Sequence, residues 1–217
     1  MSARPFAQAT VAPDIILDGR LALFHEQQRW LAVADLHFGF ELSQRVAGRL
    51  VPMWGMTSIE ERLIELLTHY QPRHLVVLGD LVHDQAAAME ARDLIDRLAR
   101  MTELILLAGN HDRHLAGAIP MRDSWQSDGF HFHHGHCQAD SGDRIQVIGH
   151  HHPSASIADG AGLRLKLPAF VQQGPCWIMP AFSPWAGGVK WQSDAESRLW
   201  LCSPARILQM PTPSVVG

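Results

Sequence analysis

Apolar runs in the first half of the chain alternate with segments in which apolar side chains recur at helical spacing. The pattern predicts strands over residues 30–34, 75–78 and 104–108, with helices over residues 57–70 and 86–101 between them. The strand runs are continuously apolar, as is typical of strands that are covered on both faces of a sheet. This alternation predicts a parallel α/β sheet with right-handed crossovers.

The ends and inward faces of these helices follow from their sequences. Thr57 or Ser58 is expected to cap the first helix, and Pro72 stops it. The second helix is expected to turn Met89, Leu94, Ile95 and Leu98 toward the core. Glycine and proline recur over residues 39–57, so we expect that segment to be irregular or only briefly helical.

The rest of the chain has a different pattern. Residues 15–17 and 21–24 flank Asp18-Gly19, which predicts a β-hairpin with that dipeptide as its turn, preceded by a loose arm over residues 1–13. Later in the chain, short strands are predicted near residues 130–133, 144–148, 163–167, 176–179 and 199–202. We expect these strands to form a second, mainly antiparallel sheet. No internal repeat or linker is visible, so residues 1–217 are expected to form a single domain.

Four of the apolar runs end directly in side chains that bind metals or transfer protons. These residues are Asp35 and His37, then Asp80, then Asn110, His111 and Asp112, and finally His150 and His152. In open α/β sheets the ligand lies outside the carboxyl ends of the strands, so we expect the first three groups to meet there. Each motif alone also fits a turn or a surface loop, and the ordered set is what indicates a metal site.

The spacing of the histidines and carboxylates suggests how they would hold ions. Asp35 and His37 are two residues apart, so an extended backbone would place both side chains on one side. By the same alternation, His150 and His152 would share a face while His151 points away. Carboxylate and amide oxygens mixed with imidazoles, without cysteine, favour Mn²⁺, Fe or Zn²⁺.

A two-metal hydrolytic centre accounts for this set of residues. Asp80 can bridge two ions with its two oxygens, and a pair of ions would clamp a phosphate and lower the pKa of a water molecule. Protonation of the leaving oxygen would then fall to His111 as general acid, with Asp112 expected to orient its imidazole.

Composition narrows the class of protein. The 217 residues include 14 histidines, many of them clustered over residues 131–136 and 150–152, and histidine is the commonest metal ligand. The formal net charge of -4 excludes a basic nucleic-acid binder by bulk charge. Three cysteines without a CxxC motif, no apolar stretch of membrane-spanning length and no visible secretory signal favour a reducing cytoplasm.

In chain order, the motifs resemble those of the calcineurin-like metallophosphoesterase superfamily. The matching motifs are Asp-x-His at 35–37, Gly-Asp at 79–80, Gly-Asn-His-Asp at 109–112, His-Gly-His at 134–136 and Gly-His-x-His at 149–152. The resemblance implies a four-layer α/β/β/α sandwich of two mixed β-sheets flanked by helices. It also implies two divalent ions, with Mn²⁺ favoured. The implied ligands are Asp35, His37 and His152 for the first metal, Asp80 as the bridge, and Asn110, His134 and His150 for the second, with His111 as proton donor. His134 is chosen over His133 because it directly precedes Gly135, as in the family's His-Gly-His pattern.

A narrower resemblance covers nearly the whole chain. Segments 34–39, 79–83, 109–113, 151–153, 167–170 and 179–182, with Gly187-Gly188, are similar to the bacterial ligase-associated DNA-damage-response phosphoesterases (PdeM-like endonucleases). That family implies DNA as substrate and a DNA ligase, a helicase and a nuclease as partners in repair. The related nucleases are often dimeric, and the sequence leaves open whether this chain forms a homodimer.

Several assignments stay open at the level of sequence. Arg113, His136 and Arg45 are candidates for substrate binding, against a default of surface side chains. Trp185 and Phe182 are either core residues or an aromatic rim on which a base stacks. A small-molecule phosphohydrolase acting on a phosphomonoester, a cyclic nucleotide or a nucleotide pyrophosphate would use the same site chemistry. A non-catalytic metal-binding adaptor is a third hypothesis, which the His111-Asp112 pair disfavours.

Overall fold

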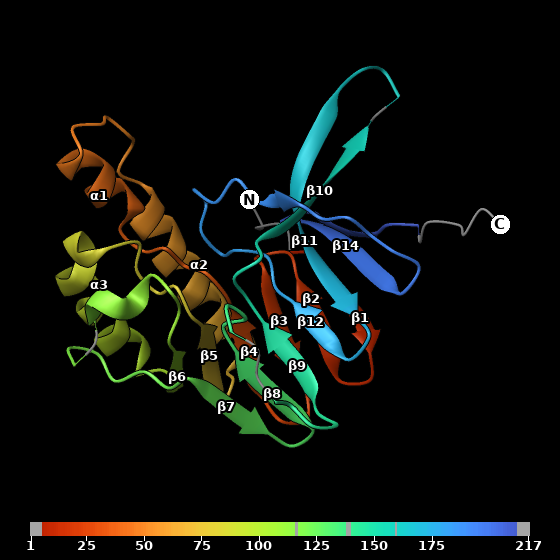
Figure 1. Ribbon diagram of the computed structural model, residues 1–217, viewed down its shortest axis with the longest axis horizontal. Coiled ribbons are helices and arrows are strands. Elements are labelled where there is room, and N and C mark those ends of the chain that lie inside the picture. Colours follow the sequence, from red (N-terminus) through yellow and green to blue (C-terminus); the bar gives the residue numbers. More distant parts are fainter. Residues whose placement is uncertain (1–5, 116, 138–139, 159, 212–217) are drawn as a thin grey trace.

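Two mixed β-sheets with flanking helices make up the computed structural model (Figure 1), which describes residues 6–115, 117–137, 140–158 and 160–211. The first sheet has the order β1-β2-β3-β4-β5-β6. Its strands are β1 (Gln8–Ala12), β2 (Ile15–Asp18), β3 (Ala22–His25), β4 (Trp30–Val33), β5 (His74–Leu78) and β6 (Glu103–Leu107). Neighbours from β1 to β4 are antiparallel, whereas β4, β5 and β6 are parallel, as the alternation of strand and helix predicts.

The helices lie between residues 40 and 115 in the described part of the chain, and Figure 1 shows α1, α2 and α3 together on one side of the strands. They are α1 (Phe40–Val46), α2 (Gly55–Tyr70), α3 (Ala88–Leu98) and the short 3-10 turns η1 (Gln85–Ala87) and η2 (Asp112–Leu115). α2 buries Ile59, Leu63 and Leu66, and α3 buries Leu94 and Leu98. No helix among the described residues is long and apolar enough to cross a membrane.

Two expectations about the helices are wrong. α2 begins at Gly55 after Trp54, which gives no side-chain capping bond, so neither Thr57 nor Ser58 is the cap. The first N–H groups of a helix need acceptors from outside the helix. In α2 the buried Glu41 carboxylate accepts the Met56 N–H at 2.7 Å, so a distant side chain takes the place of a capping residue. Met89 is 77% exposed rather than inward, because α3 begins only at residue 88 and turns Ala91 to the core.

The N-terminal segment also differs from expectation. Residues 8–12 form β1, which pairs antiparallel with β2, instead of a loose arm. The following hairpin pairs Asp18 with Ala22, so its loop holds three residues and not the dipeptide Asp18-Gly19. Leu21 takes the left-handed conformation at φ 71°, which is typical of a three-residue hairpin loop.

The second sheet is built after residue 120 and has the order β13-β10-β11-β12-β9-β8-β7, with β14 paired to β11 and β15. Its strands are β7 (Ser124–Ser127), β8 (Phe130–His133), β9 (Ile145–Ile148), β10 (Pro153–Ala158), β11 (Arg164–Gln173), β12 (Cys176–Ile178), β13 (Val189–Lys190), β14 (Ser197–Ser203) and β15 (Arg206–Gln209). Most pairings are antiparallel, as expected. β8, β9 and β12, however, are mutually parallel, so β8 and β9 end at the same edge.

The two sheets share one main hydrophobic cluster. Trp30 of β4 and Phe132 of β8 are fully buried, and their ring centroids lie 4.9 Å apart. Phe182 is also fully buried in this cluster, which makes it a core residue and excludes it from an aromatic rim. Trp177 and Trp200 pack against each other in the same core.

Candidate active site

The loops that follow β4, β5, β6, β8 and β9 meet at one edge of the two sheets. The Asp35 N–H donates to the Gly79 carbonyl at 3.2 Å, which ties the loop after β4 to the loop after β5. Across the sheets, the His150 N–H donates to both carboxylate oxygens of Asp35 at 2.9 and 3.1 Å. The Gly149 N–H donates to the His134 carbonyl at 3.1 Å. Residues from both sheets therefore form a single site.

The candidate ligands sit on unusual backbone. Nine non-glycine residues in the described chain have positive φ, and five of them are candidate ligands: Asp35, His37, Asp80, His150 and His152. Asp35 and His37 thus reach the same group of ligand atoms through left-handed turns, and not through the strand alternation that the sequence suggested. Left-handed conformations cost about 1–3 kcal/mol for such residues and persist where function requires them.

One group of ligand atoms comes from Asp35, His37, Asp80 and His152. One atom from each lies within 4.8 Å of all the others. The His37 and His152 Nε2 atoms are 3.4 Å apart, and the His152 Nε2 lies 3.4 Å from Oδ1 of Asp35. The His37 Nε2 lies 3.9 Å from Oδ2 of Asp80.

A second group surrounds the Nε2 atom of His134, which is almost fully buried. Its neighbours are Oδ1 of Asn110 at 3.1 Å, Nδ1 of His150 at 3.2 Å and Oδ2 of Asp80 at 3.6 Å. The His134 Nδ1 must donate its proton to the Leu78 carbonyl, 2.7 Å away, so a neutral ring presents a lone pair at Nε2.

These contacts test whether the donor set suits a cation. The lone pair of His134 faces the amide oxygen of Asn110 and the carboxylate of Asp80, an arrangement that a positive ion between them would stabilise. The carbonyl that fixes the His134 tautomer is a typical support for a metal-binding histidine. Oxygen and imidazole donors in both groups fit a divalent metal, and Asp80 belongs to both groups.

Glycines allow the close approach of these segments. A Cβ atom on Gly79 would lie 2.4 Å from Nδ1 of His134, and one on Gly109 would lie 2.2 Å from the Asp80 carboxylate. Both positions therefore require a residue without a side chain.

Burial sets the charge state of several of these histidines. Burial lowers the pKa of His37 to about 3, against an opposing effect of the Asp80 carboxylate. Burial also lowers the pKa of His150. Burial alone would lower the pKa of His152, but the hydrogen bond and charge of Asp35 outweigh it and raise that pKa. His37 and His150 are thus neutral at physiological pH, as metal binding requires.

His111 lies beside the first ligand group. Its ring centroid is 5.1 Å from that of His37, and its backbone N–H donates to Oδ1 of Asp80 at 2.9 Å. Its Nδ1 lies 3.2 Å from the His83 carbonyl, which accepts the Nδ1 proton, and the His83 ring stacks on the imidazole at 5.6 Å. Nε2 is then the nitrogen left to exchange a proton with a substrate.

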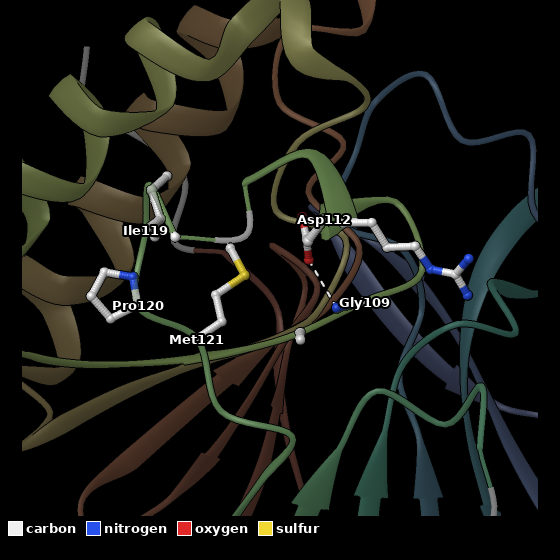
Figure 2. Close-up of a pocket in the computed structure, with 8 residues that line it drawn as sticks. Gly109, Asp112, Ile119, Pro120 and Met121 are labelled. Atoms are coloured by element: carbon white, nitrogen blue, oxygen red, sulfur yellow. Dashed lines mark hydrogen bonds between the residues drawn. The ribbon is translucent and has the colours of Figure 1, made fainter.

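Asp112 does not orient His111, and that expectation is wrong. The Asp112 carboxylate is buried and accepts the Gly109 N–H at 2.9 Å, as Figure 2 shows, and the Val82 N–H at 3.3 Å. Burial raises the pKa of Asp112, while these two backbone bonds oppose the rise. Asp112 thus ties the loop after β6 to the loop after β5, and the His83 carbonyl holds the imidazole instead.

The candidate substrate-binding residues occupy different places. Arg113 and His136 are exposed and line a cavity of about 380 Å³ beside Gly109, with the His136 and His134 ring centroids 5.2 Å apart. Arg45 is exposed in the last turn of α1, and the structure does not place it among the residues that line this cavity.

Another cavity, of about 520 Å³, is lined by Gly109, Asp112 and Arg113. Figure 2 shows Ile119, Pro120 and Met121 around it, and no candidate metal ligand lines it.

Two residues of the site were not assigned a role from sequence. His83 supports His111, and only its place soon after Gly79-Asp80 could have suggested this. Glu41 is fully buried near the site, but it lies in the segment that was expected to be irregular or only briefly helical, so no sequence signal indicated its burial.

A calcineurin-like phosphoesterase family model matches residues 29–167, which is more than half of the chain. The chain belongs to this family. It is therefore a hydrolase of phosphoester bonds, and its family binds divalent metals. The crystal structure of Pseudomonas putida nuclease MPE is similar to the structure of this phosphoesterase, with a TM-score of 0.73 and 26% sequence identity over 94% of this chain and 100% of that chain. Comparison with curated protein sequences gives no significant match.

Proposed function

We propose that this phosphoesterase is a two-metal phosphodiesterase that cuts DNA. The observation that carries the proposal is the sharing of Asp80 by two adjacent groups of ligand atoms, with His111 beside them. Similarity to a structure named a nuclease supports a nucleic-acid substrate over a phosphomonoester.

The ligand sets divide naturally between two ions. Asp35, His37 and His152 would hold the first, and Asn110, His134 and His150 the second, with Asp80 between them. We expect Mn²⁺, because carboxylate, amide and imidazole donors suit it and no cysteine is needed. When bound, such ions neutralise phosphate charge and acidify the attacking water.

The remaining chemistry belongs to the chain itself. His111 would give its Nε2 proton to the departing oxygen, while its Nδ1–H stays with the His83 carbonyl and keeps the ring in place. The stacked His83 ring limits rotation of the imidazole. The hydrogen bond from the Gly109 N–H to the Asp112 carboxylate fixes the loop that presents both Asn110 and His111.

The biological setting is part of the same proposal. The motif resemblance favours a role in ligase-associated DNA repair in the cytoplasm, with a DNA ligase, a helicase and a nuclease as partners. The same resemblance adds a homodimer to the proposal. The three cysteines are free in the structure, in keeping with a reducing compartment.

A circular single-stranded DNA tests the proposed activity, because only an endonuclease opens it. We expect the chain to linearise the circle with Mn²⁺ and to stop when a chelator is added. Asp80→Asn should abolish opening, while Asp128→Asn, a change of an exposed carboxylate outside the site, should leave it intact. Hydrolysis of phosphomonoesters without DNA cleavage would instead favour the small-molecule hypothesis. Bound metal without any turnover would favour the adaptor.

A further inference from the structure

Three aromatic side chains form a continuous surface beside the site, which we call the aromatic shelf: Phe40, Trp54 and Trp185. The Phe40 and Trp185 rings are stacked, with centroids 5.7 Å apart and planes at 27°. Trp54 lies 4.9 Å from Trp185 and is 49% exposed. Phe40 also lies 4.9 Å from His83, the ring that stacks on His111. The shelf thus runs from the candidate general acid to the surface.

A cavity of about 140 Å³ joins the shelf to the candidate ligands. Its lining includes Phe40 and Trp185 of the shelf and His37, His111 and His152 of the site. None of the described residues that line it is Lys, Arg, Asp or Glu. The two aromatic side chains in this lining suit the flat face of a ring.

A buried carboxylate holds the shelf in position. Glu41 is fully buried, and its Oε2 accepts the Trp185 indole N–H at 3.1 Å while its Oε1 accepts the Met56 N–H at 2.7 Å. A Cβ atom on Gly55 would lie 2.1 Å from the Trp185 Nε1, so the helix start also leaves room for the indole. Burial of a carboxylate is costly unless it is bonded. Here one bond fixes the half-buried indole of Trp185, and the other ties Glu41 to the start of α2.

Given the proposed function, we infer that the aromatic shelf stacks an unpaired nucleobase of the strand on the departing side of the scissile phosphate. The cavity begins at His111, the residue that would face the departing oxygen. Every base has a π-face that stacks on tryptophan, and base stacking on aromatic side chains is the usual means of binding single strands. A paired base in a duplex is already stacked on its neighbours, so the shelf favours single-stranded DNA or frayed ends.

Trp54 offers the cleanest test of the shelf. It is half-exposed and its side chain gives no capping bond to α2, so Trp54→Ala should fold normally. Trp185 is less suitable, because its removal would leave Glu41 buried without its indole partner. Leu50→Ala is the matched control, since Leu50 lies in the same segment and is 97% exposed but has no ring.

The experiment measures binding, so that it does not depend on turnover. His111→Ala protein with Mn²⁺ is titrated against a short fluorescent oligothymidylate and against an abasic strand of equal length and charge. We expect Trp54→Ala to weaken binding of the thymine strand by about tenfold and of the abasic strand by less, while Trp54→Phe and Leu50→Ala keep the affinity of the parent.

The possible results separate this inference from the proposed function. Equal affinity of the parent for both strands, or an equal loss on both strands in Trp54→Ala, would overturn the shelf as a base-binding site. Absence of diester hydrolysis by the wild-type chain would overturn the proposed function, and the binding comparison would still decide the role of the shelf.

Discussion

At the scale of single residues, the site depends on left-handed backbone that sequence patterns do not reveal. The spacing of Asp35 and His37 predicts a shared side, and the structure delivers it at φ 53° and 42° and not in a strand. Residue types could be assigned from the motifs because metal chemistry restricts them. The backbone conformation of these residues could not be predicted, because it is imposed by hydrogen bonds to other loops. One of them runs from the His37 N–H to the Asp80 carbonyl at 2.9 Å.

His111→Ala tests the general-acid role. We expect turnover of a diester with a poor leaving group to fall by about 10²–10⁴, because the departing oxygen then leaves without a proton. A diester with a good leaving group should lose less, and metal content should stay the same. Steady-state rates over a series of leaving groups measure the difference, and equal losses along the series would rule out proton donation by His111.

Asp80→Asn tests the shared ligand. An amide carries no charge and offers one oxygen, so it cannot bridge two cations as a carboxylate does. We expect the bound metal measured by elemental analysis to fall at both positions, with Asp128→Asn as the unaffected control. Two full equivalents retained by Asp80→Asn would refute the bridging assignment.

At the scale of elements, the first half of the fold could be predicted and much of the second could not. The strands β4, β5 and β6 and the helices between them have strong periodicity of their own. β7, β10, β13 and β15 escaped prediction because they are short or partly exposed and owe their conformation to pairing with strands that are distant in sequence. β1 was missed for the same reason: its partner β2 fixes it, and its own residues are mostly polar or small.

Asp112 belongs to this scale, because its carboxylate joins the loops after β5 and β6. Asp112→Ala would leave the buried N–H groups of Gly109 and Val82 without acceptors, and we expect a loss of about 1–3 kcal/mol in the free energy of unfolding. Asp112→Asn keeps one acceptor oxygen and should lose less. Urea unfolding measures both variants. Unchanged stability in Asp112→Ala, together with a large loss of turnover, would restore Asp112 as a partner of His111.

At the scale of the whole molecule, the site exists only where the two sheets are packed together. Asp35, Asp80 and Asn110 follow strands of the first sheet, while His134 and His150 follow strands of the second. The hydrogen bonds from the His150 N–H to the Asp35 carboxylate connect the two sheets at this point. Sequence could name the residues on each side, but only the shared core around Trp30 and Phe132 sets the distance between them.

A buried polar cluster outside the candidate site predicts how the stability of the fold depends on pH. Asp18 is fully buried and accepts bonds from Arg20 and Tyr70, each at 2.8 Å. Burial alone would raise the pKa of Asp18, but the bonds from Arg20 and Tyr70 outweigh it and hold that pKa below its usual value. The folded pKa is depressed, so the contribution of Asp18 is present above the unfolded pKa and is lost as pH falls through the folded pKa.

Asp18→Asn measures this contribution. At neutral pH it leaves the Arg20 guanidinium buried without its carboxylate, and we expect a loss of about 3–5 kcal/mol in the free energy of unfolding. Because the wild-type carboxylate gains a proton in acid, the difference between the two proteins should shrink as pH falls below about 4. Urea unfolding over a pH series gives the difference, and a constant gap from neutral pH into acid would contradict this account of Asp18.

The most direct measurement of the central claim is hydrolysis, with added Mn²⁺, of a phosphodiester and a phosphomonoester that share one nitrophenol leaving group. Identical leaving groups remove differences in bond cleavage, so the ratio of kcat/KM reports which phosphate the site accepts. If the chain is a metal-dependent phosphodiesterase, kcat/KM should be much higher for the diester than for the monoester, and a chelator should abolish activity. Preference for the monoester, or turnover that survives removal of the metal, would contradict it.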